Sequence, residues 1–144
     1  MQYSNNLNIP LFESYCKQCE IDGKTVTAKI GKRSLKLKVA STSSSLMKGY
    51  AGLDQPSEKE GMLFVYEDET PLSFWMKGVN YPLDIMFFNS NMELVDHQSM
   101  DACGELSDND LPKYQSNKPA RYAVEVCEGW CSKYLNEKDC NLIF

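Results

Sequence analysis

A few side chains in the second half of the sequence have the types and spacing to carry chemistry. Trp75 and Lys77 lie two residues apart, and Asp84 interrupts an apolar run. A carboxylate within an apolar run must be hydrogen-bonded, paired with a cation or placed at a pocket. A tryptophan beside an ion pair offers a flat apolar wall next to polar groups. We therefore predict one site for a small polar ligand such as a sugar, or for a protein partner. Its predicted residues are Trp75, Lys77, Asp84 and Glu125.

The role of Asp84 is open to two interpretations. In a small hydrolase, Asp84 would act with Glu125 or with His97, the only histidine, as an acid and base pair. In a purely structural role, Asp84 would cap a turn or pair with Lys77 or Arg121. No sequence around His97 resembles a nucleophile elbow, which favours a polar position at a strand end. We therefore favour the interpretation without catalysis and keep the hydrolase as the alternative.

The six cysteines do not predict a zinc site. Cys16 and Cys19 have the spacing of half a zinc knuckle. The next close pair, Cys127 and Cys131, follows more than a hundred residues later, whereas compact zinc modules place the second pair far closer. We expect reduced thiols that pack as small apolar side chains, with Cys103, Cys127, Cys131 and Cys140 in one domain and sharing no metal.

The sequence predicts no cofactor either. It contains no glycine-rich phosphate loop of the Walker or dinucleotide type. A single histidine cannot supply a three-histidine metal site. A carboxylate set of Asp84, Asp96 and Glu125 stays open as a site for a hard cation.

The elements that must position these residues are short strands. Residues 25–30 and 34–39 alternate between apolar and polar side chains around a turn at Gly31 and Lys32, which predicts a hairpin with one cationic face. In this register Lys24, Lys29, Lys36 and Lys38 face solvent, and the side chains of residues 35, 37 and 39 are buried. Hydroxyl residues 41–45 predict the cap of a short helix. Further strands are expected at 61–66, 72–77, 83–88, 93–98, 121–127 and 140–144, with a short helix at 130–136.

Two of these strands are expected to lie side by side. Pro82 favours a turn between 72–77 and 83–88, so we predict an antiparallel pair that brings Trp75, Lys77 and Asp84 into one groove. Residues 89–91 predict the next hairpin turn, since asparagine tolerates positive φ. Residues 101–119 are acidic and rich in turn formers, and predict a long loop. The strand count indicates a mostly β domain, a compact sandwich or jelly-roll-like barrel with one or two short helices.

Composition and charge limit the class of protein. The 144 residues suit one domain, at 25–144, preceded by a polar arm at 1–24 that we expect to dock on its own domain or on a partner. Residues 1–50 hold eight basic and three acidic side chains, against seven and 17 in the remainder, and an acidic chain binds nucleic acid poorly. No signal peptide and no run of roughly 20 apolar residues is found, so no membrane span is predicted. We expect a location in the cytoplasm or in an assembled particle.

Several motifs in fixed order resemble one known family. They are Ala40-x-Thr42 with Ser45-Leu46-Met47, then Gly61-Met62-Leu63-Phe64, Phe74-Trp75-Met76-Lys77, Pro82-Leu83-Asp84-Ile85-Met86-Phe87, and finally Pro119-Ala120-Arg121-Tyr122-Ala123-Val124-Glu125-Val126 with Gly129. Over about residues 35–144 the chain is similar to the bacterial and archaeal "domain of unknown function 192". This resemblance implies a compact, mostly β domain and brings no known reaction, substrate or cofactor.

Three departures from the family pattern affect the expected site. Ser45 replaces the usual glycine before Leu-Met, Gly78-Val79 replaces Asn-Thr after Phe-Trp-Met-Lys, and Lys138-Asp139 replaces Gly-Asp. The loss of Asn-Thr removes two hydrogen-bonding side chains next to the site. We therefore predict a binding or interaction module without catalysis, an accessory structural subunit of a larger assembly such as a virus particle. The small hydrolase remains the alternative.

Overall fold

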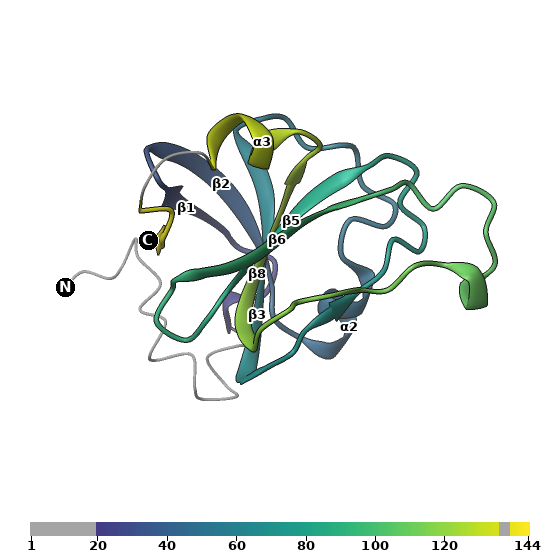
Figure 1. Ribbon diagram of the computed structural model, residues 1–144, viewed down its shortest axis with the longest axis horizontal. Helices are drawn as coiled ribbons and strands as arrows, with labels where there is room; N and C mark the ends of the chain where they lie inside the picture. Colours follow the sequence, from purple (N-terminus) through teal and green to yellow (C-terminus); the bar gives the residue numbers. More distant parts are fainter. Residues whose placement is uncertain (1–19, 136–138) are drawn as a thin grey trace.

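The computed structural model describes residues 20–135 and 139–144. Its strands are β1 (Thr25–Ile30), β2 (Arg33–Ala40), β3 (Glu60–Thr70), β4 (Ser73–Phe74), β5 (Leu83–Phe88), β6 (Leu94–Met100), β7 (Tyr114–Gln115), β8 (Ala120–Cys127) and β9 (Leu142–Ile143). The short helices are α2 (Ser43–Lys48), α3 (Trp130–Tyr134) and the 3-10 turn η2 (Asp108–Asp110). The predicted mostly β, barrel-like class with two short helices is confirmed, since one curled sheet dominates Figure 1.

The main sheet has seven strands in the order β6-β5-β8-β3-β2-β1-β9, and β4 pairs with β7 in a separate two-stranded sheet. Among the described strands only β2 and β3 pair in parallel, and every other pair is antiparallel. Parallel neighbours need a crossover connection. Residues 41–59 provide it, and they include α2.

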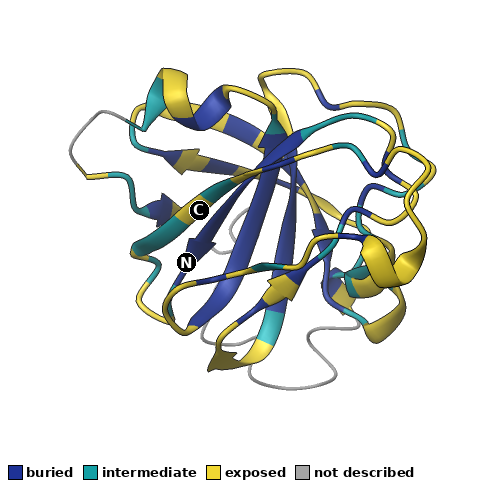
Figure 2. Cartoon of the chain, turned by 45° about the vertical axis from the view of Figure 1, so that its right-hand side comes forward, coloured by how far each residue is buried: buried dark blue, intermediate teal, exposed yellow. Residues whose placement is uncertain are grey.

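The sheet has two faces with different coverings. The first, which we call the core face, carries the apolar side chains of β1, β2, β3, β5 and β8 and is closed by α3 and β9. The second, the pocket face, carries side chains of β3, β5 and β8 and is covered by α2, the β4–β7 pair and the connections between them. Strand β5 is buried at all six positions because both of its faces are covered. Figure 2 shows this contrast between the buried central strands and the largely exposed loops.

Helix α2 begins where the hydroxyl cluster predicts. Thr42 is the N-cap, and its hydroxyl and that of Ser45 form a reciprocal capping box. The carboxylate of Asp22 accepts hydrogen bonds from the backbone N–H of Ser41, at 2.8 Å, and from the hydroxyl of Ser45. Gly49 ends the helix at φ 51°, a left-handed value that favours glycine. These contacts fix α2 against the end of β2.

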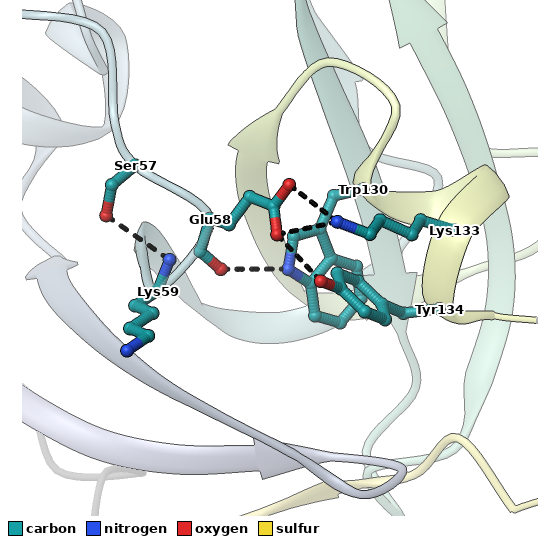
Figure 3. Close-up of polar contacts among 6 residues, drawn as sticks. All are labelled: Ser57, Glu58, Lys59, Trp130, Lys133 and Tyr134. Carbon is teal, nitrogen blue, oxygen red and sulfur yellow. Dashed lines mark hydrogen bonds and ion pairs between the residues drawn. The ribbon is translucent and has the colours of Figure 1, made fainter.

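Helix α3 is joined to the crossover by an exposed polar cluster (Figure 3). The carboxylate of Glu58 accepts hydrogen bonds from Lys133 Nζ, at 2.9 Å, and from Tyr134 Oη, at 2.7 Å. The indole N–H of Trp130 donates to the backbone carbonyl of Glu58 at 3.1 Å. Trp130 is itself almost fully buried, so it anchors α3 on the core face.

Several predictions about the strands can be compared directly with the structure. In the first hairpin all four lysines at 24, 29, 36 and 38 are exposed, and the side chains of Leu35, Leu37 and Val39 are buried, which confirms the predicted register. The turn between β5 and β6 is also present, but the residue with positive φ is Met92, at 66°, rather than an asparagine.

The division of the chain into an arm at 1–24 and a domain at 25–144 stays a prediction, and the structure describes the arm only from residue 20 onward. Ile21 is buried in the core face, and Asp22 caps α2, so this part of the arm packs against the domain. Residues 1–19, with Cys16 and Cys19, lie outside the described residues. No helix in the described part of the chain is long and apolar enough to span a membrane.

Candidate functional site

A pocket of about 360 Å³ opens on the pocket face of the sheet. Strands β3 and β8 form its floor, and α2 and the β4–β7 region form its sides. Its lining residues are Ser43, Leu46, Met47, Lys48, Gly49, Tyr50, Phe64, Tyr66, Ser73, Phe74, Trp75, Lys77, Val79, Lys113 and Glu125. Concave sites of this size with apolar walls and few polar groups are typical of small-ligand sites.

Glu125 is the carboxyl group at the floor of this pocket. It lies on β8 and is only 3% exposed. In register it stands opposite Met62 of β3 and Ile85 of β5, and directly opposed residues share one face of a sheet. Both neighbours are buried and apolar, so neither can donate a hydrogen bond.

No described residue donates a hydrogen bond to the Glu125 carboxyl group. Burial raises the pKa of Glu125 to about 8, because no nearby cation or donor compensates for the lost hydration of the carboxylate. A buried polar group without a partner costs free energy in the folded protein. The Glu125 carboxyl group therefore has no hydrogen-bond partner among the described residues, although the phenols of Tyr50 and Tyr66 line the same pocket.

Aromatic side chains form the walls of the pocket. The rings of Phe64 and Phe74 pack edge to face with centroids 4.9 Å apart, and Tyr66 packs on Phe74 at 6.3 Å. Burial, and then the charge of Glu125, raise the pKa of the hydroxyl groups of Tyr50 and Tyr66. Both phenols therefore stay protonated at neutral pH and can donate hydrogen bonds.

Lysines form the rim around Trp75. The ammonium group of Lys113 lies 4.5 Å from the centroid of the Trp75 ring, and that of Lys77 lies 5.4 Å away. Lys77 also forms an exposed ion pair with Asp108, at 2.7 Å. Lys48, at the end of α2, is the third lysine of the lining. The pocket thus has a buried acid at its floor and three exposed cations at its mouth.

Gly49 keeps space open above the acid. A Cβ atom at this position would lie 3.4 Å from Phe64 Cζ and 3.7 Å from Glu125 Oε1. Both atoms belong to pocket residues, so any larger side chain here would reduce the space beside the carboxyl group. The left-handed φ of Gly49 therefore serves both the end of α2 and the shape of the pocket.

The comparisons with known proteins identify the family. The model for domain of unknown function 192 (DUF192), described as "Uncharacterized ACR", matches residues 25–142. The chain belongs to this family. No curated protein matches the DUF192 chain.

Two solved structures share the DUF192 fold. One is a protein of unknown function from Novosphingobium aromaticivorans, with 18% identity and a TM-score of 0.71 over 83% of this chain and 85% of that one. The other is a putative transcription regulator from Sinorhizobium meliloti, with 21% identity and a TM-score of 0.71 over 85% of this chain and 95% of that one. At these identities the similarity concerns the fold.

Three of the four predicted site residues of the DUF192 chain meet in the pocket: Trp75, Lys77 and Glu125. The predicted grouping of Asp84 with them is wrong. Trp75 and Lys77 follow β4, which pairs with β7 and not with the Asp84 strand. Strand β5 pairs with β6 and β8. The turn at Pro82 therefore does not join adjacent strands, and Lys77 pairs with Asp108 instead of Asp84.

Asp84 faces the opposite side of the sheet from Glu125. In the β5–β8 register Ile85 opposes Glu125 and Asp84 opposes Val126, and successive side chains alternate between faces. The Asp84 carboxylate accepts hydrogen bonds from Ser99 Oγ, at 3.1 Å, and from the backbone N–H of Cys131 in α3, at 3.0 Å. The structural interpretation of Asp84 as a capping group thus matches its contacts.

The other candidate groups also lie apart from the pocket. His97 is exposed on the edge strand β6, opposite Met86. Asp96 accepts hydrogen bonds from Gln98 and from the backbone of Asn117. Asp84, Asp96 and Glu125 therefore do not form the carboxylate site left open by the sequence. In residues 20–135 and 139–144, no group of three or more His, Cys, Asp or Glu side chains is placed to hold a metal ion.

The four described cysteines are free thiols within the DUF192 domain. Cys103 and Cys131 are buried, and Cys127 and Cys140 are half-buried. Burial raises the pKa of the thiols of Cys127 and Cys131, which opposes formation of the reactive thiolate. None of the four lines the pocket.

Sequence reasoning missed several residues of the pocket: Lys48, Gly49, Phe64, Phe74 and Lys113. The glycine that follows the capped helix was the one local signal available, because a helix end is a place where glycine takes a positive φ. Lys113 had no such signal, since its segment was expected to be a loop without structure.

Proposed function

We propose that this DUF192 domain binds a small polar ligand in the pocket above Glu125 and does not catalyse a reaction on it. The supporting observation is the buried Glu125 carboxyl group, which no described residue satisfies although it lines an open pocket. A ligand with a hydrogen-bond donor would supply the missing partner. The aromatic walls suit a ligand that presents an apolar surface between its polar groups.

The pocket lining favours binding over hydrolysis. Among the described residues that line it, Glu125 is the only carboxylate, and neither His97 nor Asp84 takes part. The hydrolase alternative needed one of these two groups beside Glu125 to divide the work of acid and base. The raised pKa of Glu125 would also suit a general acid, so the binding experiment below includes a test for turnover.

Two wider roles are not part of this proposal. One similar structure carries the description of a putative transcription regulator, but this chain has 20 acidic against 15 basic side chains, which opposes a general affinity for nucleic acid. Membership of a larger assembly stays a prediction from the sequence. The arm on which it rested lies mostly in residues 1–19, outside the described part of the chain.

The experiment compares two glycine variants in a ligand screen. Gly49→Ala places a methyl group beside Phe64 and Glu125, whereas Gly52→Ala meets nothing within 4 Å. Both glycines have positive φ, 51° and 80°, so both substitutions introduce backbone strain. The wild type and both variants are screened by thermal shift and calorimetry against sugars, carboxylates, phosphates and small amines.

We expect at least one compound class to bind the wild type and Gly52→Ala, and to lose about tenfold or more in affinity for Gly49→Ala. NMR spectra of each bound compound over time should show no conversion. Absence of binding by every class, or equal binding by the two variants, would contradict the proposal. Conversion that stops in Glu125→Gln would favour the hydrolase instead.

A further inference from the structure

The charges of the pocket indicate which small molecule it takes. We infer that the ligand is a small zwitterion, whose ammonium group lies against Glu125 and whose anionic group lies between the lysines of the rim. This inference rests on the proposed function and specifies its ligand class. It follows from three features: the floor, the walls and the mouth of the pocket.

The Glu125 carboxyl group at the floor of the pocket has no hydrogen-bond donor among the described residues, and a cationic N–H group is the strongest donor that a ligand can supply. Glu125 lies between Met62 and Ile85, with no donor and no cation of the described chain in contact with it. An ammonium group brings three N–H donors and a charge, and a charge-assisted hydrogen bond is about twice as strong as a neutral one. Because Glu125 is only 3% exposed, the low local dielectric strengthens this pairing further.

The walls are compatible with a cation. Phe64, Phe74 and the phenols of Tyr50 and Tyr66 line the same space as Glu125. The electron-rich faces of aromatic rings attract ammonium groups, and aromatic cages are a common way to bind them. Aliphatic carbons between the two charges of a zwitterion would also pack on these rings.

The mouth favours an anion. Lys48 and Lys113 form no ion pair among the residues described, and both are exposed at the rim. Together with Lys77 they repel a ligand that is only a cation. A ligand that is only an anion would meet the lysines but leave Glu125 without a partner. A molecule with both charges, the ammonium group inward, complements both ends of the pocket.

A neutral sugar is the competing occupant. Its hydroxyl groups could bond to a protonated Glu125 carboxyl, and its apolar face could stack on Trp75. Such a ligand would bring no anionic group to Lys48 and Lys113. The charge arrangement therefore favours the zwitterion, and the sugar is an outcome of the test.

The test compares a ligand that has both charges with analogues that have only one of them. Calorimetry at pH 9 and low salt, above the pKa of about 8 that burial gives Glu125, compares 6-aminohexanoate with hexylamine, which lacks the acid, and with hexanoate, which lacks the amine. Because the depth of the pocket sets the best spacing, β-alanine, 4-aminobutanoate and O-phosphoethanolamine are included, together with glucose. The protein variants are Glu125→Gln, Lys113→Met and, as a control, Lys59→Met, an exposed lysine outside the pocket.

We expect at least one zwitterion to bind about tenfold more tightly than either single-charge analogue. Glu125→Gln should weaken zwitterion and hexylamine binding about tenfold and leave hexanoate unchanged. Lys113→Met should weaken zwitterion and hexanoate binding without weakening hexylamine binding, and Lys59→Met should change none of them.

Two results would overturn the inference while the proposed function stands: glucose binding more tightly than every zwitterion, or unchanged zwitterion affinity in Glu125→Gln. If no compound binds here and the wider screen is also negative, the proposed function fails with it. The two failures are therefore distinguishable.

Discussion

Asp84 and Glu125 lie on neighbouring strands of one sheet and are almost equally buried, at 1% and 3% exposure. Asp84 faces the core side and receives hydrogen bonds from Ser99 and from the backbone of α3. Glu125 faces the pocket and receives none from the described residues. The difference shows that burial of an acid does not by itself indicate function. The presence or absence of donors within the chain separates an acid that supports the fold from one that is left open to groups from outside it.

Glu58 extends the comparison to an exposed acid. Its carboxylate has hydrogen bonds from Lys133 and Tyr134, so it has as many described partners as Asp84. Its surroundings differ, because water can replace those partners at an exposed site. If donors matter mainly where water is excluded, substitutions at these three acids should have clearly different effects.

The largest expected effect is the pH dependence caused by Glu125. Its pKa is raised from 4.5 to about 8 in the folded state, so the folded protein holds a proton that the unfolded chain releases in this range. The contribution of Glu125 to stability is therefore fully present below about pH 4.5 and is lost as the pH rises to about 8. We expect the wild type to lose on the order of 3 kcal/mol more than Glu125→Gln between pH 5 and pH 8, in urea denaturation.

The comparison with Glu125→Gln isolates this group, because other residues titrate equally in both proteins. Parallel pH profiles of the two proteins would show that Glu125 has a partner in solution. The contrast with Asp84 would then not hold.

Asp84→Asn should have the next largest effect. The amide keeps one oxygen to accept from the Cys131 N–H and can only donate to the Ser99 hydroxyl, so two hydrogen bonds to a carboxylate become weaker neutral ones. We expect the free energy of unfolding at pH 7 to fall by about 2 kcal/mol, with ligand binding unchanged in the refolded protein. Asp96→Asn, on the half-buried edge strand β6, is the control and should cost less. A loss of binding without a loss of stability would assign Asp84 to the site.

Glu58→Gln should have the smallest effect. The hydrogen bonds from Lys133 and Tyr134 bring the pKa of Glu58 below its usual value, but the group is exposed and screened by water. We expect a change in melting temperature close to experimental error, measured by calorimetry at pH 7. A destabilisation as large as that of Asp84→Asn would show that the cluster in Figure 3 acts as a unit.

The sequence predicted the direction of side chains correctly where one face of a strand is exposed, and failed where both faces are buried. In β1 and β2 one face is exposed, so the alternation of lysine with Leu35, Leu37 and Val39 fixed the register correctly. In β5 both faces are buried, and the alternation disappears. An acid in such a run can face either side, which is why the position of Asp84 relative to Glu125 could not be derived.

The pocket itself depended on pairings that local pattern does not contain. Phe74 pairs with Tyr114, forty residues later, in a segment whose turn formers predicted an irregular loop. A two-residue strand carries too few side chains for a period to be visible. Trp75 and Lys113 lie close together because of this pairing. The sequence could therefore predict Trp75 as a site residue, but it could not predict Lys113.

The parallel pairing of β2 with β3 affects how this family could diversify. Such a pair requires a crossover, so a connection like residues 41–59 must exist whatever its sequence. Here that obligatory connection supplies one side of the pocket, including Leu46, Met47 and Lys48, and Met47 is 77% exposed. Connections tolerate substitution and insertion far better than the strands they join. Ligand preference could therefore change through this crossover while the sheet, and the acid at its centre, stay as they are.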